Sequence, residues 1–358
     1  CGDSFDKSLS FHSRDYDIIV GNPPWRRKPL RTGDEFCIAH RFTVVGEYAV
    51  PFLWLAHLRA PAGLVAMLFP SKLLFNREGP DTEFRRRFFS ENNVHAVINL
   101  SALRKDNLFA ATGPATAIIF SPNQAERSSS ILYCTPKPLH NGTFSLALLL
   151  EGSEMKWLPR GDAERHDDIW KTMTWGRGRD LALVRQLKRT PSLKEYIEAR
   201  GWPRARGFQD ANARTSIVDD WLADLPHLPA RNVERYSVPR AALVRCYSQN
   251  TFSRTPEPRI FLKPHVVVKE GQANSLFCAS YVDRDCSFKD TITGIGGPPE
   301  DAPLLKALTC YLNSPLVSYI LFHTSSTWGV ERPRVKIGEM LSVPAFLPSE
   351  AADVARLA

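Results

Sequence analysis

The sequence predicts an α/β fold, with a mostly parallel sheet followed by a second region of mixed helices and strands. Over residues 1–150, short β-branched apolar runs alternate with segments long enough for helices. This alternation is typical of a mostly parallel sheet with helices on both faces. Near residue 150 the alternation stops, and tryptophan and proline become frequent. A chain of 358 residues has room for two cores, so we expect two domains, 1–150 and 151–358.

The elements of the first region follow in order. Residues 16–22 (YDIIVGN) are a short apolar run ended by turn residues, which predicts a fully buried strand. Residues 46–60 are long enough for a helix, which Pro61 and Gly63 would end. The sequence then predicts a buried strand over 63–75, a helix over 79–92, and strands over 94–100, 116–122 and 131–136.

The second region predicts an α+β arrangement without repeats. Residues 181–200 indicate two short helices separated at Pro191, and residues 302–326 indicate a helical hairpin broken at Pro315. Strands are expected within 259–271 and 276–286.

Composition narrows the classes of partner. The formal net charge is +8 and the isoelectric point about 9.2, which is compatible with a polyanionic partner such as nucleic acid. The seven cysteines form no CxxC pair and the nine histidines no HxH or HxxxH pair, so we expect a reducing compartment and no metal site. No apolar stretch is long enough to cross a bilayer and no signal peptide is visible, which predicts a cytoplasmic protein without a membrane partner.

The most informative stretch is DYDIIVGNPPWRR, residues 15–27. A parallel strand that ends in a rigid turn places its last residues at the carboxyl edge of the sheet, where ligands bind in doubly wound folds. Pro23 and Pro24 lack N–H donors but keep carbonyl acceptors, and Asn22 adds a side-chain acceptor. Trp25 offers a flat face for stacking. Two acceptors beside a ring suit an aromatic heterocycle with an exocyclic amine, such as adenine.

This stretch resembles the Asp/Asn/Ser-Pro-Pro-aromatic motif of the amino-group DNA methyltransferases, and its long form looks like the adenine-N6 branch. The resemblance implies a partial Rossmann-like methyltransferase domain, of which 1–150 is the C-terminal part. Residues 151–358 would form the target-recognition, DNA-binding domain. Asn22, Pro23, Pro24 and Trp25 would be the catalytic residues. The structural alternative is a proline-rich turn in which Trp25 covers a core.

Three further positions follow from the resemblance. In CGDSF, Asp3 and Ser4 would bind the cofactor S-adenosylmethionine; alternatively, Asp3 is a loop or capping residue. Phe109 in DNLFAATGPATAIIF would stack on the target base together with Trp25, or it belongs to the core.

The family's main cofactor loop, Phe-x-Gly-x-Gly, does not occur before the turn. The sequence begins at Cys1 without a methionine, so we expect the loop upstream of Cys1. The glycine-rich stretch 290–299 (DTITGIGGPP) is the other candidate, as a permuted cofactor loop or as an ordinary loop.

In the second region, Arg204, Arg206, Arg332 and Arg334 are the expected DNA-binding residues, with Trp328 beside them. Taken singly, each of these arginines is also typical of a solvated surface.

The function predicted is methyl transfer from S-adenosylmethionine to N6 of adenine in double-stranded DNA. It would proceed by base flipping and direct transfer, within a restriction-modification system that includes a restriction or specificity subunit or domain. Two alternatives stay open. One is a protein-glutamine or RNA-amine methyltransferase that uses the same pocket, and the other is an inactive DNA-specificity module.

Overall fold

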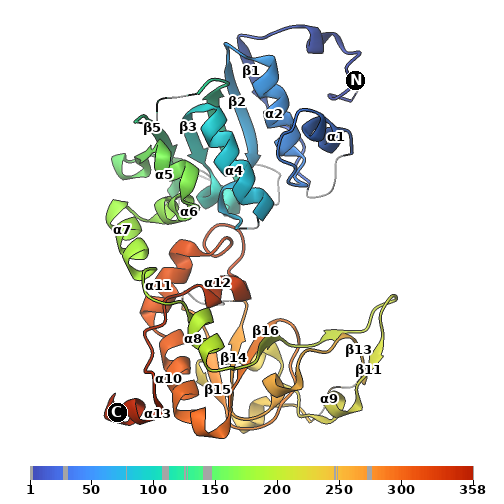
Figure 1. Ribbon diagram of the computed structural model, residues 1–358, viewed down its shortest axis with the longest axis vertical. Coiled ribbons are helices and arrows are strands. Elements are labelled where there is room, and N and C mark those ends of the chain that lie inside the picture. The colour runs from blue at the N-terminus through green and yellow to red at the C-terminus, as the bar shows by residue number, and fades with distance from the viewer. Residues whose placement is uncertain are drawn as a thin grey trace. The chain divides into compact units, whose positions relative to one another are not determined.

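The chain forms two compact units (Figure 1). The computed structural model describes the chain except residues 1–2, 27–30, 78, 107–112, 125, 127, 140–146, 246, 248, 272–275 and 358. The first unit comprises Cys1–Leu181 with Gly329–Arg332, and the second comprises Ala182–Trp328 with Pro333–Ala358.

A six-stranded sheet forms the centre of the first unit. Its strand order is β1 (Ile18–Gly21), β2 (Leu64–Pro70), β4 (Ala115–Ser121), β3 (Asn93–Asn99), β5 (Ser130–Cys134) and β8 (Met155–Pro159). The pairs β1–β2 and β3–β5 are parallel, whereas β4 is antiparallel to both β2 and β3, and β8 is antiparallel to β5. Strands β1, β2, β3 and β5 therefore run in one direction. The predicted α/β class with a mostly parallel sheet is confirmed, and the insertion of β4 between β2 and β3 is what the sequence did not predict.

The helices of this unit pack on one face of the sheet. They are α1 (Arg31–Ala39), α2 (Ala49–Arg59), α3 (Lys72–Phe75), α4 (Gly79–Glu91), α5 (Arg160–Arg165) and α6 (Asp168–Trp175), and α7 (Gly178–Leu187) follows. The predicted helices over 46–60 and 79–92 are confirmed. The strand predicted over 63–75 ends earlier, at Pro70, because Ser71 bonds to the start of β4 and the chain then turns into α3. A short hairpin of β6 (Lys137–Leu139) and β7 (Ala147–Leu149) lies outside the main sheet.

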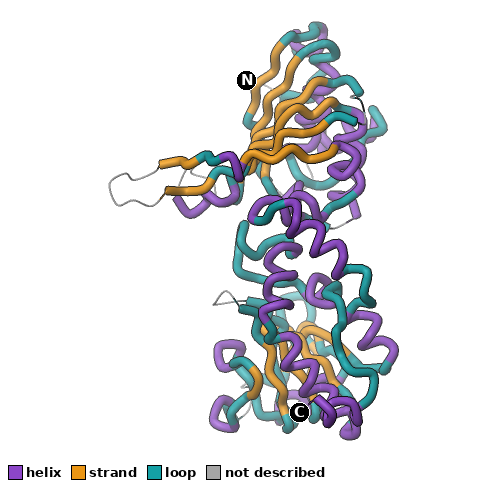
Figure 2. Tube along the Cα trace, turned by 90° about the vertical axis from the view of Figure 1, so that its left-hand side faces the viewer, coloured by secondary structure: helices purple, strands orange, loops and turns teal. Residues whose placement is uncertain are grey.

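Alternate strand residues point to this helical side. Trp54 of α2, Phe88 of α4 and Trp170 of α6 share one core with Val65 of β2 and Ile118 of β4. Figure 2 shows the helices of the unit gathered along that face.

The opposite face of the sheet carries a row of apolar side chains that are not buried. Strand register aligns one residue from each strand, in the order Val20, Ala66, Ile119, Ala96, Leu132 and Trp157. Val20 is 77% exposed and Trp157 68% exposed. Helices were expected on both faces, but those among the described residues cover one. The strand expected to be fully buried, β1, is an edge strand with an exposed face.

The division between the units lies later than the expected position near residue 150. Strand β8 pairs with β5, and Ala163, Ile169 and Trp170 of α5 and α6 belong to the first core. Their packing extends the first unit to Leu181. Residues 329–332 also belong to it, because Val330 is buried in the same core.

The second unit is α+β, as predicted. A five-stranded sheet has the order β12 (Tyr236–Ser237), β15 (Ala279–Val282), β14 (His265–Lys269), β16 (Ile292–Gly296) and β9 (Arg204–Arg206), and a small sheet has the order β10 (Gln209–Asp210), β13 (Thr251–Arg254) and β11 (Ile217–Val218). The helices are α8 (Leu193–Ala199), α9 (Asp220–Asp224), α10 (Ala302–Leu312), α11 (Pro315–Thr324), α12 (Ile337–Leu341) and α13 (Ala351–Leu357).

The helix breaks at the two prolines are confirmed. Ser192, just after Pro191, caps α8 by accepting from the Glu195 amide, and Ser314 caps α11, whose first residue is Pro315. This agrees with the preference of serine for the cap position and of proline for the first helical turn.

The strands predicted within 259–271 and 276–286 are shorter than expected, since β14 and β15 cover only their central residues. In β14, Val266 and Val268 pack in one core and Val267 in another, so both faces of the strand are buried.

No single helix in the described part of the chain is long and apolar enough to cross a membrane. By length and composition alone, the bent pair Pro299–Leu312 and Pro315–Thr324 passes that test, with 59° between its helices.

Candidate active site

The Asn-Pro-Pro-Trp turn follows β1 directly, at the carboxyl end of the strand. The Leu64 amide donates to the Asp17 carbonyl at 2.8 Å, where the chain enters both β1 and β2. Gly63 permits this approach, because a Cβ at residue 63 would lie 2.4 Å from the Tyr16 carbonyl oxygen. The register of β1 against β2 is thus fixed, and the turn follows Gly21, which pairs with Met67, while β2 continues to Pro70.

The two expected acceptors of the turn are open. Asn22 is exposed and Pro23 is buried. Among the described residues, neither the Asn22 side chain nor the Pro23 carbonyl makes a hydrogen bond. An amide oxygen and a carbonyl oxygen on neighbouring residues are therefore free to accept from one amino group.

Trp25 is half-buried beside these acceptors. Its indole nitrogen is buried and has no hydrogen-bond partner in the described part of the chain. The next residue, Arg26, accepts a hydrogen bond at its carbonyl from the Tyr48 amide, at 3.0 Å. This contact attaches the end of the turn to the start of α2.

The neighbouring edge of the sheet is held by buried hydroxyl groups. The Ser71 Oγ and Thr116 Oγ1 atoms are 2.6 Å apart, and the Ser71 amide donates to the Pro114 carbonyl at 2.8 Å. Both Ser71 and Thr116 are 0% exposed. Beside them, Lys72 forms an ion pair of 2.9 Å with Glu47. Sequence reasoning did not single out any of these residues, because only tertiary pairing brings them to this edge. Phe109 lies outside the described residues.

Asp3 stabilises a local turn. Its Oδ1 atom accepts from the Phe5 amide at 3.0 Å, and its carbonyl accepts from the Asp6 amide at 2.9 Å. Asp3 is therefore a loop residue in this structure, which is one of the alternatives that the sequence left open. Asp3 is exposed, and its other carboxylate oxygen makes no hydrogen bond with the described residues.

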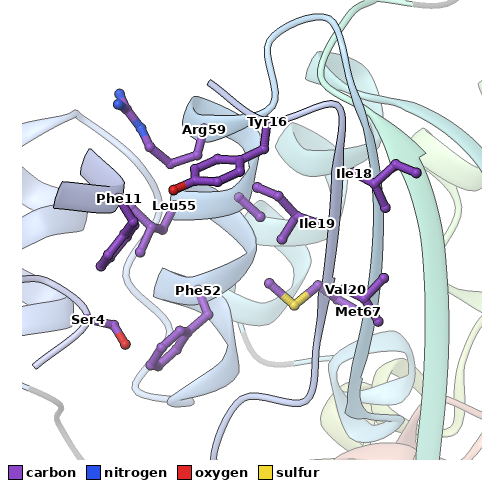
Figure 3. Close-up of a pocket in the computed structure, with 11 residues that line it drawn as sticks. Ser4, Phe11, Tyr16, Ile18, Ile19, Val20, Phe52, Leu55, Arg59 and Met67 are labelled. Atoms are coloured by element: carbon purple, nitrogen blue, oxygen red, sulfur yellow. The ribbon is translucent and has the colours of Figure 1, made fainter. Parts of the chain in front are cut away.

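Ser4 lies at an apolar pocket along β1 (Figure 3). The pocket has a volume of about 340 Å³ and is lined by Ser4, Phe11, Tyr16, Ile18, Ile19, Val20, Phe52, Leu55, Ala56, Arg59 and Met67. Ile18 and Val20 contribute the strand side, and Phe52 and Leu55 the side of α2. The pocket therefore ends two residues before the Asn-Pro-Pro-Trp turn, at Val20.

The glycine-rich stretch 290–299 is part of a sheet, not a loop. Residues Ile292–Gly296 form β16 and all are buried. A Cβ at Gly294 would lie 2.6 Å from the Phe288 ring and 3.0 Å from the Ile260 carbonyl. Close packing explains this glycine, so the permuted cofactor loop and the ordinary loop are both wrong.

The four predicted DNA-binding arginines lie in different settings. Arg206 and Arg334 pair with Glu270 at 3.0 and 2.6 Å, and Arg204 pairs with Glu198 at 2.5 Å. Arg332 is exposed and belongs to the first unit. The structure therefore brings together Arg206 and Arg334 at Glu270.

The expectation that Trp328 accompanies these arginines on a DNA-facing loop is wrong. Trp328 is 5% exposed and packs edge-on against Phe322 in the second core.

A pocket of about 690 Å³ in the second unit is lined by other arginines. Arg240, Arg245 and Arg284 line it together with Asp283 and Asp285. Arg284 pairs with Asp283 at 2.9 Å. Arg240 and Arg245 are exposed, and neither forms an ion pair with the described residues. No sequence pattern distinguishes these two from other surface arginines.

A metal site and a reactive thiol are two further kinds of site that the described residues could form. Within the described ranges, no group of three or more His, Cys, Asp or Glu side chains is placed to hold a metal ion. Burial, with a contribution from Asp34, raises the pKa of the Cys37 thiol to about 12, which leaves it a poor nucleophile.

The first unit is an α/β domain with an open Asn-Pro-Pro-Trp turn at the carboxyl end of β1. Residues 1–140 match the family model described as N-6 DNA Methylase. The predicted resemblance is therefore confirmed for this segment, which contains the Asn-Pro-Pro-Trp turn. A search of curated proteins gives no significant match.

Several of the solved structures that match this chain come from restriction-modification systems. The type IIL enzyme MmeI in complex with DNA has a TM-score of 0.51 and 9% identity over 93% of this chain and 46% of its own. The type IIG endonuclease BpuSI has a TM-score of 0.40 and 10% identity, over 98% and 50%. A type I modification subunit from Vibrio vulnificus YJ016 has a TM-score of 0.30 and 17% identity, over 39% and 28%. The chain thus spans half or less of each of these proteins, and the likeness to MmeI confirms the fold class.

Proposed function

We propose that the protein is a DNA adenine-N6 methyltransferase that uses S-adenosylmethionine and acts in a restriction-modification system. One observation carries the proposal: the Asn22 amide and the Pro23 carbonyl are free acceptors at the carboxyl end of β1, beside the half-buried Trp25. The match of residues 1–140 to the N-6 DNA methylase family supports it.

The chemistry follows from the acceptors. The exocyclic amine of adenine is conjugated with its ring and is a poor nucleophile. Hydrogen bonds to Asn22 and to the Pro23 carbonyl favour a tetrahedral nitrogen whose lone pair is available, and such preorganised acceptors stabilise the charge that develops. S-adenosylmethionine, when bound, supplies an electrophilic methyl group. Because the amine lies inside the duplex, the base is flipped out at a cost of roughly a few kcal/mol, which stacking on Trp25 and Phe109 would offset.

Some residues of this chain suit the cofactor. The free carboxylate oxygen of Asp3 can accept from an adenine amino group, and Ser4 lines the adjacent pocket. The remaining residues of the cofactor site would pack against the free edge of β1. Ile18 and Val20 are 67% and 77% exposed there, and the strand pairs on one side only among the described strands.

DNA contacts in the second unit are proposed at two places. The first place comprises the four arginines predicted from the sequence, whose contacts with DNA stay predictions: Arg204, Arg206, Arg334 and, in the first unit, Arg332. A phosphate would have to compete with Glu198 for Arg204 and with Glu270 for Arg206 and Arg334. Arg240 and Arg245 form no ion pair with the described residues, although Asp283 and Asp285 line the same pocket. They are the better candidates for phosphate contacts. A restriction or specificity subunit or domain would complete the system.

The test is methyl transfer by the full-length protein from labelled S-adenosylmethionine to duplex DNA. Digestion to nucleosides should yield N6-methyladenine. If the label appeared instead in N4-methylcytosine, in RNA or in protein glutamine, the substrate would be cytosine in DNA, RNA or protein, and the adenine proposal would be wrong. Absence of transfer with intact DNA binding would favour the inactive specificity module.

A further inference from the structure

The ion pair between Lys72 and Glu47 lies beside the catalytic turn and belongs to no motif that the sequence shows. The Lys72 Nζ atom is 2.9 Å from Glu47 Oε2, and the Glu47 side chain is 2% exposed while that of Lys72 is 30% exposed. A carboxylate this deeply buried requires compensation by a cation.

Glu47 is connected to the turn through the next residue along the chain. The Tyr48 amide donates to the Arg26 carbonyl at 3.0 Å, and Arg26 follows Trp25 directly. The Glu47 carbonyl accepts from the Val50 amide at 3.0 Å, in the first turn of α2. A shift of Glu47 therefore moves Tyr48, and with it the anchor of the turn.

Lys72 is connected to the rigid sheet on its other side. It follows Ser71, whose amide and hydroxyl bind Pro114 and Thr116 at the start of β4. The Lys72 carbonyl accepts from the Asn76 amide at 2.8 Å, which closes the short helix α3. The backbone of Lys72 is thus held by β2, β4 and α3.

We propose that Lys72 and Glu47 are positioning residues, which hold the Asn-Pro-Pro-Trp turn in register with the carboxyl edge of β2. The inference rests on the proposed function, since the turn is the site being positioned. The link runs from β2 through Lys72 and Glu47 to Tyr48 and Arg26. Misplacement of a reacting group by about 1 Å costs about 100-fold in rate, so a small shift of Asn22 is sufficient to matter.

The kinetic test uses Lys72→Met and Glu47→Gln in the full-length protein. We expect kcat for methyl transfer to fall by about 10- to 100-fold, with KM for DNA within threefold. Lys72→Arg, which keeps the cation, should recover most of the rate. Arg86→Met is the matched control, because the Arg86–Glu83 pair is exposed on α4, and it should leave kcat unchanged.

The structural test follows hydrogen exchange at the Tyr48 amide, which requires no activity. Exchange should become faster in Lys72→Met and Glu47→Gln and stay unchanged in Arg86→Met. An unchanged Tyr48 amide would overturn the proposal. So would a rise in KM for DNA at constant kcat, which would make Lys72 a DNA contact, or a lower melting temperature with normal kcat per folded molecule.

These outcomes separate the two claims. A wild-type protein without methyltransferase activity would overturn the proposed function, whereas exchange at Tyr48 would still decide whether the ion pair holds the turn.

Discussion

Arg206 and Arg334 bind the same carboxylate, that of Glu270, and Arg206 reaches both of its oxygens, since its Nη2 atom donates to Oε2 at 3.3 Å. The Arg206 Nε atom is 3.0 Å from Glu270 Oε1, and the Arg334 Nη2 atom is 2.6 Å from Glu270 Oε2. Glu270 is 7% exposed, so the two arginines compensate a buried charge. Arginines that are far apart in the sequence and that suggested DNA contact therefore also have a structural role in the second unit.

We expect Arg206→Gln to lower the free energy of unfolding by about 1–2 kcal/mol, because Glu270 loses one of its cations. Breaking a fully buried pair costs about 3–5 kcal/mol, and the Arg206 side chain is 29% exposed, which reduces the effect. Urea unfolding of the variant and wild type measures it. Arg204→Gln, whose partner Glu198 is 48% exposed, is the control and should change stability less.

The double substitution Arg240→Gln/Arg245→Gln should weaken DNA binding without loss of stability. Removal of one arginine–phosphate contact reduces the slope of log K against log salt by about 0.9, so the slope should fall by roughly 1.8 if both arginines bind phosphate. Titration of labelled duplex at several salt concentrations gives the slope. An unchanged slope in this variant, together with a reduced slope in Arg206→Gln/Arg334→Gln, would assign the contacts to the Glu270 network instead.

Asn22→Ala should reduce kcat for methyl transfer by at least about 100-fold, the cost typical of losing one preorganised polar contact to the reacting group. DNA affinity should stay within about threefold, because the turn contacts one base. Single-turnover methylation and DNA titration measure the two effects. Asn123→Ala, at an exposed loop position of the same unit, is the control. Wild-type rates in Asn22→Ala would exclude the proposed role of the turn.

Trp25→Ala should impair the flipped state of the target base. Loss of base stacking on an aromatic side chain costs about 1–3 kcal/mol. With 2-aminopurine at the target position, the fluorescence increase on binding should be smaller than in wild type. Trp157→Ala removes an exposed tryptophan from β8 and should leave the signal intact. An equal loss in both variants would point to a general effect on the domain.

The second unit should lose stability in mild acid. Burial lowers the pKa of His265 from 6.5 to about 4, and burial together with Lys289 lowers the pKa of His227 to about 4. Between pH 6.5 and about 4, these two histidines bind protons in the unfolded chain but stay neutral in the folded protein. The free energy of unfolding therefore falls as the pH drops from 6.5 to about 4, on the order of 2–3 kcal/mol per ring.

Histidine variants separate the loss of stability caused by the buried histidines from that caused by protonation of carboxylates. His265→Asn keeps a donor toward the Leu262 carbonyl, which the ring reaches at 2.9 Å, and should flatten the dependence of unfolding on pH between 6.5 and 4. His227→Asn should do the same by a separate route. His166→Gln, an exposed position, should retain the wild-type slope, and a wild-type slope in both buried variants would show that other groups govern the acid transition.

Local chemistry was sufficient for the sequence to predict the turn and many elements. Two prolines restrict the backbone and remove N–H donors wherever they occur, and a preceding asparagine adds a side-chain acceptor, so Asn22–Trp25 could be recognised without a fold. The helix breaks at Pro191 and Pro315 follow from the same restriction. The α/β class followed from the spacing of apolar runs.

The tertiary structure decided what depends on contacts between distant segments. Strand β4 lies between β2 and β3, and no residue pattern within β4 specifies its neighbours. Whether an arginine is free or paired depends on which carboxylate the fold brings near it, as Glu270 does for Arg206 and Arg334. Lys72 looks like any surface lysine in the sequence, and only the packing of α2 against β2 places Glu47 at 2.9 Å from it. The sequence by itself determined the acceptor groups of the turn, and the tertiary structure determined their support.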